Sequence, residues 1–285
     1  MDSTFWLVLA TSTLTLGAPL ILAALGGFMS ERSGVINIAL EGKMLMSCAV
    51  TGIVGVATHN PWLGVLAGIG SSVLLSLGHW LVTQGYQVDH IVSGMAVNAF
   101  AVGATNFLDK RFTDPAHSGE VPQLPTAAYY ILALGLPLLV AWAVARTRPG
   151  LRLRAAGSDP EKARVMGLNP PRIRLFSLLW TGVFCGLSGA LIVSNARFFT
   201  DGMTAGRGFI ALAALIIGGW RPIPTMAACL VFGFLQALQI QLQGTNFMGV
   251  EVPREVWMCL PYAATIIALA GFLGKMRPPA GLGKP

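Results

Sequence analysis

Charged residues are scarce in this chain. Asp, Glu, Lys and Arg make up 11% of its 285 residues, whereas hydrophobic residues make up 54%. Water-soluble domains usually carry about 25% charged residues. The sequence therefore lacks the polar surface that a soluble globule needs, and it predicts an integral membrane protein.

Motifs for intramembrane or nucleotide chemistry are also missing. The sequence contains no HExxH, GxSxG or GxxxxGK[ST] pattern, so it predicts neither a catalytic centre nor ATP hydrolysis by this chain itself. The cysteines have no CxxC spacing and no neighbouring histidine, which argues against a metal site or a disulfide framework. No cofactor is expected, and we interpret the cysteines as small buried hydrophobic residues. They are Cys48, Cys185, Cys229 and Cys259.

Long apolar segments follow one another along most of the chain. A helix that crosses a bilayer needs about 20 mostly apolar residues. We expect an all-α, multi-pass bundle of about nine spans, with a range of about eight to ten, in one domain over residues 1–285. The expected spans are Phe5–Phe28, Met44–Thr58, Trp62–Val82, His90–Phe107, Tyr129–Ala145, Phe176–Ala196, Gly208–Trp220, Thr225–Leu242 and Val256–Leu273.

Two of these segments, Met44–Thr58 and Gly208–Trp220, are short. Short apolar segments beside Gly-rich polar sequence are typical of broken or re-entrant helices. Glycines at helical spacing elsewhere predict close packing of helices rather than functional sites. These glycines are Gly64 and Gly68 in one span and Gly182, Gly186 and Gly189 in another.

The basic residues behind the net charge of +7 gather in two places. One is the segment Arg146–Arg174, and the other is the tail with Lys275, Arg277 and Lys284. Basic loops mark the cytoplasmic side of membrane proteins, so both segments are expected there, with the N-terminus on the opposite side. This clustering argues against nucleic-acid binding.

The basic segment contains signals for a short helix outside the bilayer. Ser158 with Glu161 three residues later predicts a capping box. Gly167 predicts the helix end, and Pro170 and Pro171 prevent its continuation. The predicted helix, Asp159–Met166, is too short to be stable alone in water. It must pack against the membrane domain or against a partner.

Polar residues follow the first span directly, in the sequence SERSGVINIALEGKM. Asn37 and Glu41 are four residues apart, so on a helix they share one face. Two interpretations remain open for this stretch. It is either an interfacial loop, with Glu41 paired to Arg32 or Lys43, or a broken helix that lines a substrate path.

Two further polar sites lie near apolar segments. Thr204 and Arg207 precede the apolar half-span Gly208–Trp220, which is either a half-helix aimed at a substrate or a helix preceded by an external turn. Asn98 lies inside the span His90–Phe107. A lone Asn at this depth usually makes an interhelical hydrogen bond, and binding a ligand is the alternative.

Four stretches resemble a known family. They are SERSGVINIALEGKM, LRAAGSDPEKARVMGLNPPRIR, GLSGAL and TDGMTAGRGFIALAALIIGGWRP, and they occur in the family's order. The chain resembles the permease subunits of ABC importers for nucleosides and simple sugars, a group that includes branched-chain amino acid permeases. The last stretch resembles the nucleoside branch in particular.

The resemblance implies roles for particular residues. The matching positions of the basic segment resemble the coupling helix that docks on a separate cytoplasmic ATPase; they are Gly157, Asp159, Pro160, Ala163 and Gly167. Asn37 and Glu41 lie in a segment similar to the irregular element near the translocation path. With Asn98, Thr204 and Arg207 they form the expected substrate pathway.

The resemblance also implies partners. They are a second permease subunit in a heterodimer, a cytoplasmic ATP-binding subunit and an extracytoplasmic solute-binding lipoprotein, all at a bacterial cytoplasmic membrane. The main alternative is an ion-coupled secondary transporter or channel. Such proteins usually keep a titratable residue deep in a span, and Glu41 is the main candidate here.

Overall fold

The computed structural model describes residues 3–112, 120–243, 246–247, 250–251, 253, 256–257, 259–272 and 277–284. The chain is almost entirely helical over these residues. The helices are α1 (Ser3–Arg32), α2 (Leu40–Thr58), α3 (Pro61–Trp80), η1 (Leu81–Gly85), α4 (His90–Phe112), α5 (Thr126–Arg146), α6 (Arg148–Ser158), α7 (Pro160–Val165), α8 (Pro170–Ala196), α9 (Arg207–Ile217), α10 (Pro222–Leu242) and α12 (Leu260–Phe272). A two-stranded antiparallel pair joins β1 (Asn246–Phe247) to β2 (Val250–Glu251).

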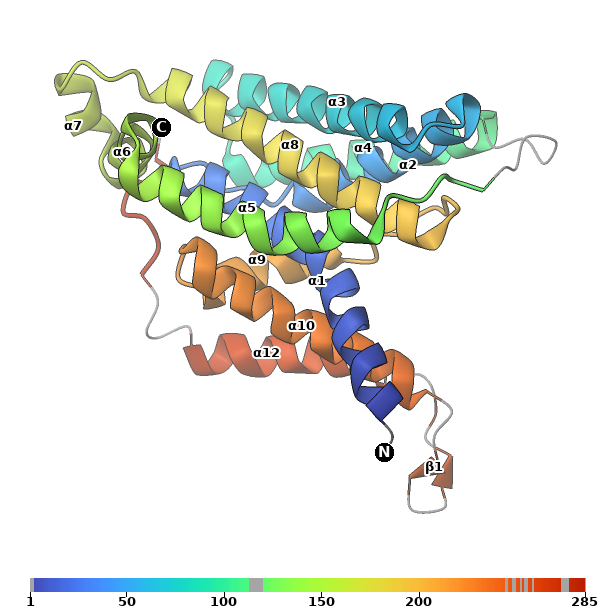
Figure 1. Ribbon diagram of the computed structural model, residues 1–285. Helices are drawn as coiled ribbons and strands as arrows, with labels where there is room; N and C mark the ends of the chain where they lie inside the picture. The colour runs from blue at the N-terminus through green and yellow to red at the C-terminus, as the bar shows by residue number, and fades with distance from the viewer. Residues whose placement is uncertain are drawn as a thin grey trace.

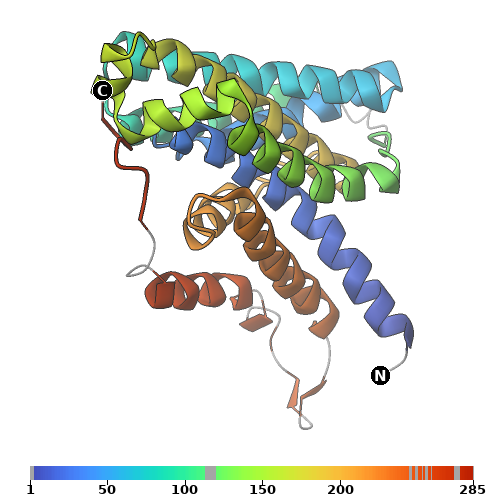
Figure 2. The same cartoon turned by 60° about the vertical axis from the view of Figure 1, so that its left-hand side comes forward.

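The long helices form one bundle around α1 and α8. Helix α3 packs against both α2 and α8, and α4 packs against α2. On the other side of α1 lie α9 and α10, with α12 beyond them (Figures 1 and 2). The C-terminus returns to α6, at the end of the molecule where α7 lies (Figure 1).

The helices agree with the expected multi-pass architecture. Among the described residues, six helices are long and apolar enough to cross a membrane, and the pair α5 and α6, bent by 78°, adds a seventh. The short helices α9 and α12 lie in the other two expected spans. The expected number of about nine spans is therefore approximate. Helix α6 was not predicted, because its arginines give the segment a low hydropathy. Leu273 and Lys275 lie outside the described residues.

Helix α2 is longer than expected. It begins at Leu40 rather than Met44, and it has 19 residues. Glu41 and Lys43 lie inside it, so a hydropathy reading placed its start too late. Helix α9, with 11 residues, is short as predicted.

The glycines predicted to pack helices together do so. A Cβ at Gly186 would lie 2.6 Å from Ile69 Cα, and a Cβ at Gly182 would lie 2.7 Å from Val73 Cα. Helix α8 thus lies against α3 with almost no space between the backbones. On α3, a Cβ at Gly64 would lie 2.9 Å from the Thr51 carbonyl oxygen of α2, and a Cβ at Gly68 would collide with the Thr51 hydroxyl.

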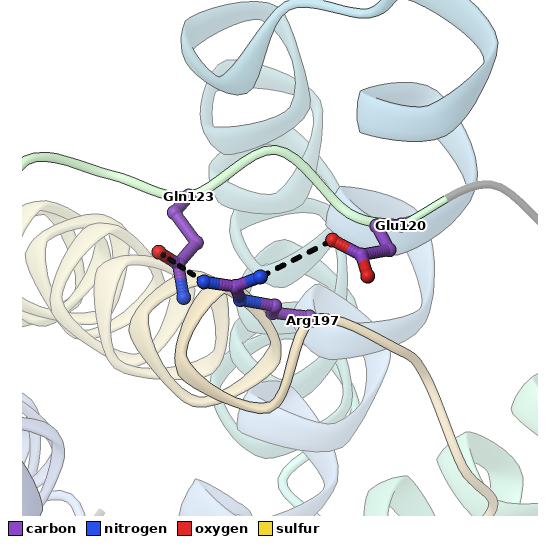
Figure 3. Close-up of polar contacts among 3 residues, drawn as sticks. All are labelled: Glu120, Gln123 and Arg197. Atoms are coloured by element: carbon purple, nitrogen blue, oxygen red, sulfur yellow. Dashed lines mark hydrogen bonds and ion pairs between the residues drawn. The ribbon is translucent and has the colours of Figure 1, made fainter.

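At the end of the bundle away from α6 and α7, residues 120–123 form a loop that crosses the C-terminal end of α8. Arg197 is the left-handed C-cap residue of α8, and its guanidinium donates to Glu120 at 3.3 Å and to Gln123 at 3.2 Å (Figure 3). The backbone N–H of Val121 donates to the Arg197 carbonyl at 2.8 Å. These bonds fix residues 120–123 on α8 just before α5 begins.

The cysteines follow the prediction at three positions. Cys48, Cys185 and Cys229 are buried, whereas Cys259 is exposed, so the prediction was wrong there. Cys259 lies in the turn just before α12, which packs on α9 and α10 at one side of the bundle.

Replacing Gly186 by Val should destabilise the bundle, because the new side chain would meet the α3 backbone. Overpacking of this kind costs about 1–3 kcal/mol, which corresponds to a fall of about 2–12 °C in melting temperature. Thermal unfolding in detergent measures it. Gly70→Val is the control, because a Cβ at Gly70 meets no atom within 4 Å. Equal melting temperatures for the two variants would contradict the packing role.

Candidate functional site

The chain breaks its helical path between α1 and α2. Asn37 lies in this break and is fully buried. Its amide Nδ2 donates to Ser30 Oγ at 3.1 Å, and its Oδ1 accepts from the Ala39 backbone N–H at 3.2 Å. Asn37 thereby joins the end of one helix to the start of the next. It precedes α2, so Asn37 and Glu41 do not lie on one helix.

The carboxylate of Glu41 binds the start of α9. It accepts from the Gly206 N–H at 2.8 Å and from the Gly208 N–H at 2.6 Å. The first N–H groups of a helix have no partner within the helix, and a negative charge is favourable there. Gly206, the N-cap residue, has no side chain to supply this acceptor. Glu41 supplies it from 165 residues away in the sequence.

This arrangement corrects an expectation about Glu41. Among the described residues, Glu41 forms no ion pair with Arg32 or Lys43, the partners considered from the sequence. Residues 33–39 connect α1 to α2, two helices that are each long enough to cross a membrane. That this connection lines a substrate path stays a prediction.

Asn98 supplies an acceptor to a backbone N–H group in the first turn of α2. Its Oδ1 accepts from the Gly42 N–H at 2.8 Å, and its Nδ2 donates to the Ile38 carbonyl at 3.0 Å. The bond between helices that was expected of a lone Asn is therefore present, and its partners are backbone groups at the start of α2. The side chain is only half-buried.

Thr204 and Arg207 lie in the turn that leads into α9. Thr204 is buried, and its carbonyl accepts from the Arg207 N–H at 2.9 Å. The Tyr262 hydroxyl of α12 donates to the carbonyl of Ala205 in the same turn at 3.1 Å. The structure therefore places the five predicted pathway residues at two helix breaks that Glu41 connects. Their role in a pathway stays a prediction.

Sequence reasoning missed three polar contacts beside these breaks. Lys43 is fully buried, and its Nζ lies 3.4 Å from Asn37 Oδ1 and 3.3 Å from His79 Nδ1. Lys43 and His79 are 36 residues apart, so no local sequence pattern indicates this contact. Buried Glu31 accepts from Trp220 Nε1 at 2.6 Å, which ties the end of α1 to the end of α9.

The short helix in the basic segment is present but differs in its cap. Asp159 is the N-cap residue, and its Oδ1 accepts from the Lys162 N–H at 3.0 Å. Ser158 instead belongs to α6, and its hydroxyl donates to the Arg154 carbonyl at 2.8 Å. The predicted capping box was therefore wrong. The same residue type suits both roles, because serine hydroxyls also bond to carbonyls four residues back.

The position of Asp159 at the start of α7 changes the pKa of its carboxyl group. The Lys162 backbone N–H, and then the Lys162 ammonium group, lower the pKa of this carboxyl below its ordinary value. A lowered pKa in the folded state means that the cap stabilises α7 at neutral pH. That stabilisation is lost as the pH falls through the lowered pKa.

Helix α7 ends as the sequence predicted, in a left-handed glycine. Gly167 has φ of +79°, and the Leu168 N–H donates back to the Ala163 carbonyl at 3.0 Å. Pro170 and Pro171 do not merely stop the helix, since they form the first turn of α8 after the N-cap Asn169.

The two faces of α7 differ. Pro160 and Ala163 are buried toward the bundle, whereas Val165 and Met166 are 90% and 78% exposed. Apolar side chains so exposed at a helix end provide a small hydrophobic contact surface.

The junction between α6 and α7 packs directly on the first helix break. Gly157 is buried, and a Cβ there would collide with the Arg32 carbonyl. The carbonyl of Gly157 accepts from the Gly281 N–H of the C-terminal tail at 2.9 Å, and the Gly283 N–H donates to the Gly34 carbonyl at 2.9 Å. Residues 281–283 therefore join α6 to the break between α1 and α2.

A buried arginine completes this junction. Arg174 of α8 donates to the Lys284 carbonyl at 2.7 Å, to Gln84 Oε1 at 2.8 Å and to the Ser33 carbonyl at 3.4 Å. The two expected basic segments thus lie at one end of the molecule, as predicted. Arg174 itself, however, is not a surface charge, because its guanidinium holds the tail in place.

These observations define the class of the protein. Six or seven candidate membrane spans among the described residues, with a short exposed helix at one end of the bundle, are typical of a transport protein. Residues 9–269 match the family described as the permease component of branched-chain amino acid transport systems. The chain belongs to this family and is a multi-pass membrane protein.

Known relatives match over nearly the full chain. The guanosine ABC transporter permease protein NupQ of Bacillus subtilis is 36% identical, over 98% of this chain and 96% of its own length. The nucleoside ABC transporter permease protein NupC of Lactococcus lactis is 33% identical, over 95% and 94%.

A solved structure shares the fold. It is described as an inward-facing conformation of a metal-chelate type ABC transporter, and it matches 93% of this chain and 85% of its own chain, with a TM-score of 0.52 and 14% sequence identity. This likeness supports the arrangement of the helices and nothing about the solute.

Replacing Glu41 by Ala should abolish most solute uptake, because the first N–H groups of α9 would lose their acceptors. Losing an N-cap typically costs about 1 kcal/mol, and the cost is greater where water cannot replace the bond. We expect uptake by membrane vesicles to fall at least about tenfold. Asp201→Ala removes an exposed carboxylate from the turn before α9 and is the control. Normal uptake by Glu41→Ala would show that this bond is dispensable.

Removing residues 279–285 should loosen the α6–α7 segment, since Gly157 and Arg174 would lose bonds to the tail. We expect trypsin to cleave after Arg152 or Arg164 several-fold faster. Lys284→Ala is the control, because Arg174 binds the main-chain carbonyl at this position. Unchanged cleavage after the truncation would contradict a holding role for the tail.

Proposed function

We propose that this chain is a non-catalytic permease subunit of an ATP-driven ABC importer for nucleosides. The observation that carries the proposal is α7, a capped helix with an exposed apolar end that is joined to a helix break inside the bundle. A helix of six residues is not stable alone. We infer that a separate ATPase subunit covers its exposed end.

A chain of contacts connects α7 to the polar residues inside the bundle. A shift of α7 would move Gly157, which touches the backbone of Arg32. Asn37 and Glu41 lie a few residues further along, and Glu41 holds the start of α9. Displacement of α7 by the ATPase would thus be passed to both helix breaks, and the bundle would open alternately to its two sides.

The side chains at the breaks suit a neutral, polar solute. Asn98 is half-buried, and Arg207 is partly buried at the start of α9. Amide and guanidinium groups bind hydroxyl groups and the edges of bases. The relatives named for guanosine and nucleoside transport support this substrate class.

The proposal includes partners and a location. A second permease subunit would complete the pathway as a heterodimer, and a solute-binding lipoprotein would deliver the nucleoside. No large domain outside the bundle occurs in the described part of the chain that could capture the solute. We place the complex in a bacterial cytoplasmic membrane, with α6 and α7 on the cytoplasmic side, where basic segments are favoured.

One observation favours an ion-coupled carrier as a second candidate. Lys43 and His79 form a titratable pair deep in the bundle, as carriers driven by protons often do. Both side chains are fully buried, however, and in this conformation they have no contact with solvent. The ATP-driven function therefore has the stronger support.

Replacing Val165 and Met166 together by Asp should uncouple the permease. Both side chains are exposed, so the fold should persist, whereas a charged surface would disfavour an apolar contact with the ATPase. In the reconstituted complex we expect ATP-dependent nucleoside uptake to fall at least about tenfold, while the chain is still inserted in the membrane.

The matched control for this double variant is Tyr86→Asp, at a residue that is 74% exposed and forms the C-cap of η1. Its uptake should remain close to that of the unmodified chain. If Val165→Asp with Met166→Asp transports normally, α7 is not the coupling element.

A further inference from the structure

A cavity lies beside the coupling segment and outside the helix breaks. It has a volume of about 790 Å³ and is bounded by α5, α6 and α8. This volume falls within the range of about 300–1,000 Å³ that is typical of small-molecule sites. Helices α5 and α8 form its two walls, and Figure 1 shows them on the face toward the viewer, with α6 at their left ends.

The walls of the cavity are apolar and partly open to the surroundings. Leu139 of α5 and Phe176 and Trp180 of α8 are each more than half exposed, although they lie on spanning helices. Ala143 and Phe184 line the cavity more deeply. In a bilayer these side chains contact acyl chains rather than water, so the slot suits a hydrocarbon chain.

The end of the cavity near α6 and α7 is polar and positively charged. Arg152 of α6 and Arg172 of α8 line it, together with Thr147 and Asn169. Among the described residues, neither arginine forms an ion pair with a protein carboxylate. Two guanidinium groups in this position are suited to bind a phosphate group through paired N–H donors.

We propose that this cavity binds one anionic phospholipid from the leaflet next to α6 and α7. An acyl chain would lie between α5 and α8, and Arg152 and Arg172 would bind the headgroup phosphate. Basic pockets between helices on the cytoplasmic side suit anionic headgroups. A free phosphate ion would leave the apolar walls uncovered, and an uncharged lipid would leave the two arginines without a counter-charge.

The position of the cavity gives the lipid a mechanical role. It is bounded by α6 on one side of α7 and by Gly167, Leu168 and Asn169 on the other. A lipid held there would brace both ends of the segment that carries α7. This role rests on the proposed function, whereas binding itself does not.

Trp180 provides a direct test of binding, because it lines the cavity. Bromine atoms on an acyl chain quench the fluorescence of a tryptophan in contact with that chain. The complex is placed in bilayers that contain a small fraction of brominated phosphatidylglycerol or brominated phosphatidylcholine. We expect stronger quenching by the anionic lipid, and the difference should disappear in Trp180→Phe.

Two sets of variants separate the headgroup from the acyl chain. Replacing Arg152 and Arg172 by Gln should weaken binding of the anionic lipid about tenfold. Replacing Arg154 and Arg164 by Gln removes the same charge from the same segment outside the cavity, and binding should persist. Ala143→Phe should fill the slot and reduce quenching by both lipids.

Equal quenching by the two lipids, or full binding after loss of Arg152 and Arg172, would overturn the proposal. Absence of quenching that depends on Trp180 would also overturn it, because a helix of another subunit would then cover the cavity. The assay uses neither ATP nor a transported solute, so its failure would leave the proposed transport function standing.

Discussion

The structure depends on satisfying backbone N–H groups where helices begin inside a membrane bundle. Unpaired N–H groups in the bilayer cost several kcal/mol each, so a helix that starts there needs acceptors from elsewhere. Glu41 supplies both acceptors for α9, and Asn98 supplies one for α2. These side chains hold the starts of both helices in place, and Glu41 joins the start of α2 to the start of α9.

A second junction connects these breaks to the end of the bundle. Gly157 brings the start of α7 against the end of α1, and Arg174 holds the C-terminal tail over the same place. Such close contact works only with glycine at position 157, because any side chain would enter the Arg32 backbone. The exposed helix and the buried polar residues are therefore parts of one continuous structure rather than separate features.

Sequence patterns predicted local features well, and long-range pairings poorly. Hydropathy located the membrane helices, and Gly167 marked the end of α7, because both signals lie within a few neighbouring residues. The partner of Glu41 is 165 residues away and consists of backbone groups, which no residue pattern records. The same holds for Lys43 with His79. Ser158 misled the cap prediction, since serine suits a helix end as well as a helix start.

The most direct test of the central claim is nucleoside uptake into proteoliposomes that contain this chain with the proposed partners, an ATPase, a second permease subunit and a binding lipoprotein. Uptake should require ATP on the side of the ATPase, and it should continue when the proton gradient is abolished. Uptake driven by a proton gradient in vesicles that contain this chain alone, without ATP, would contradict the account.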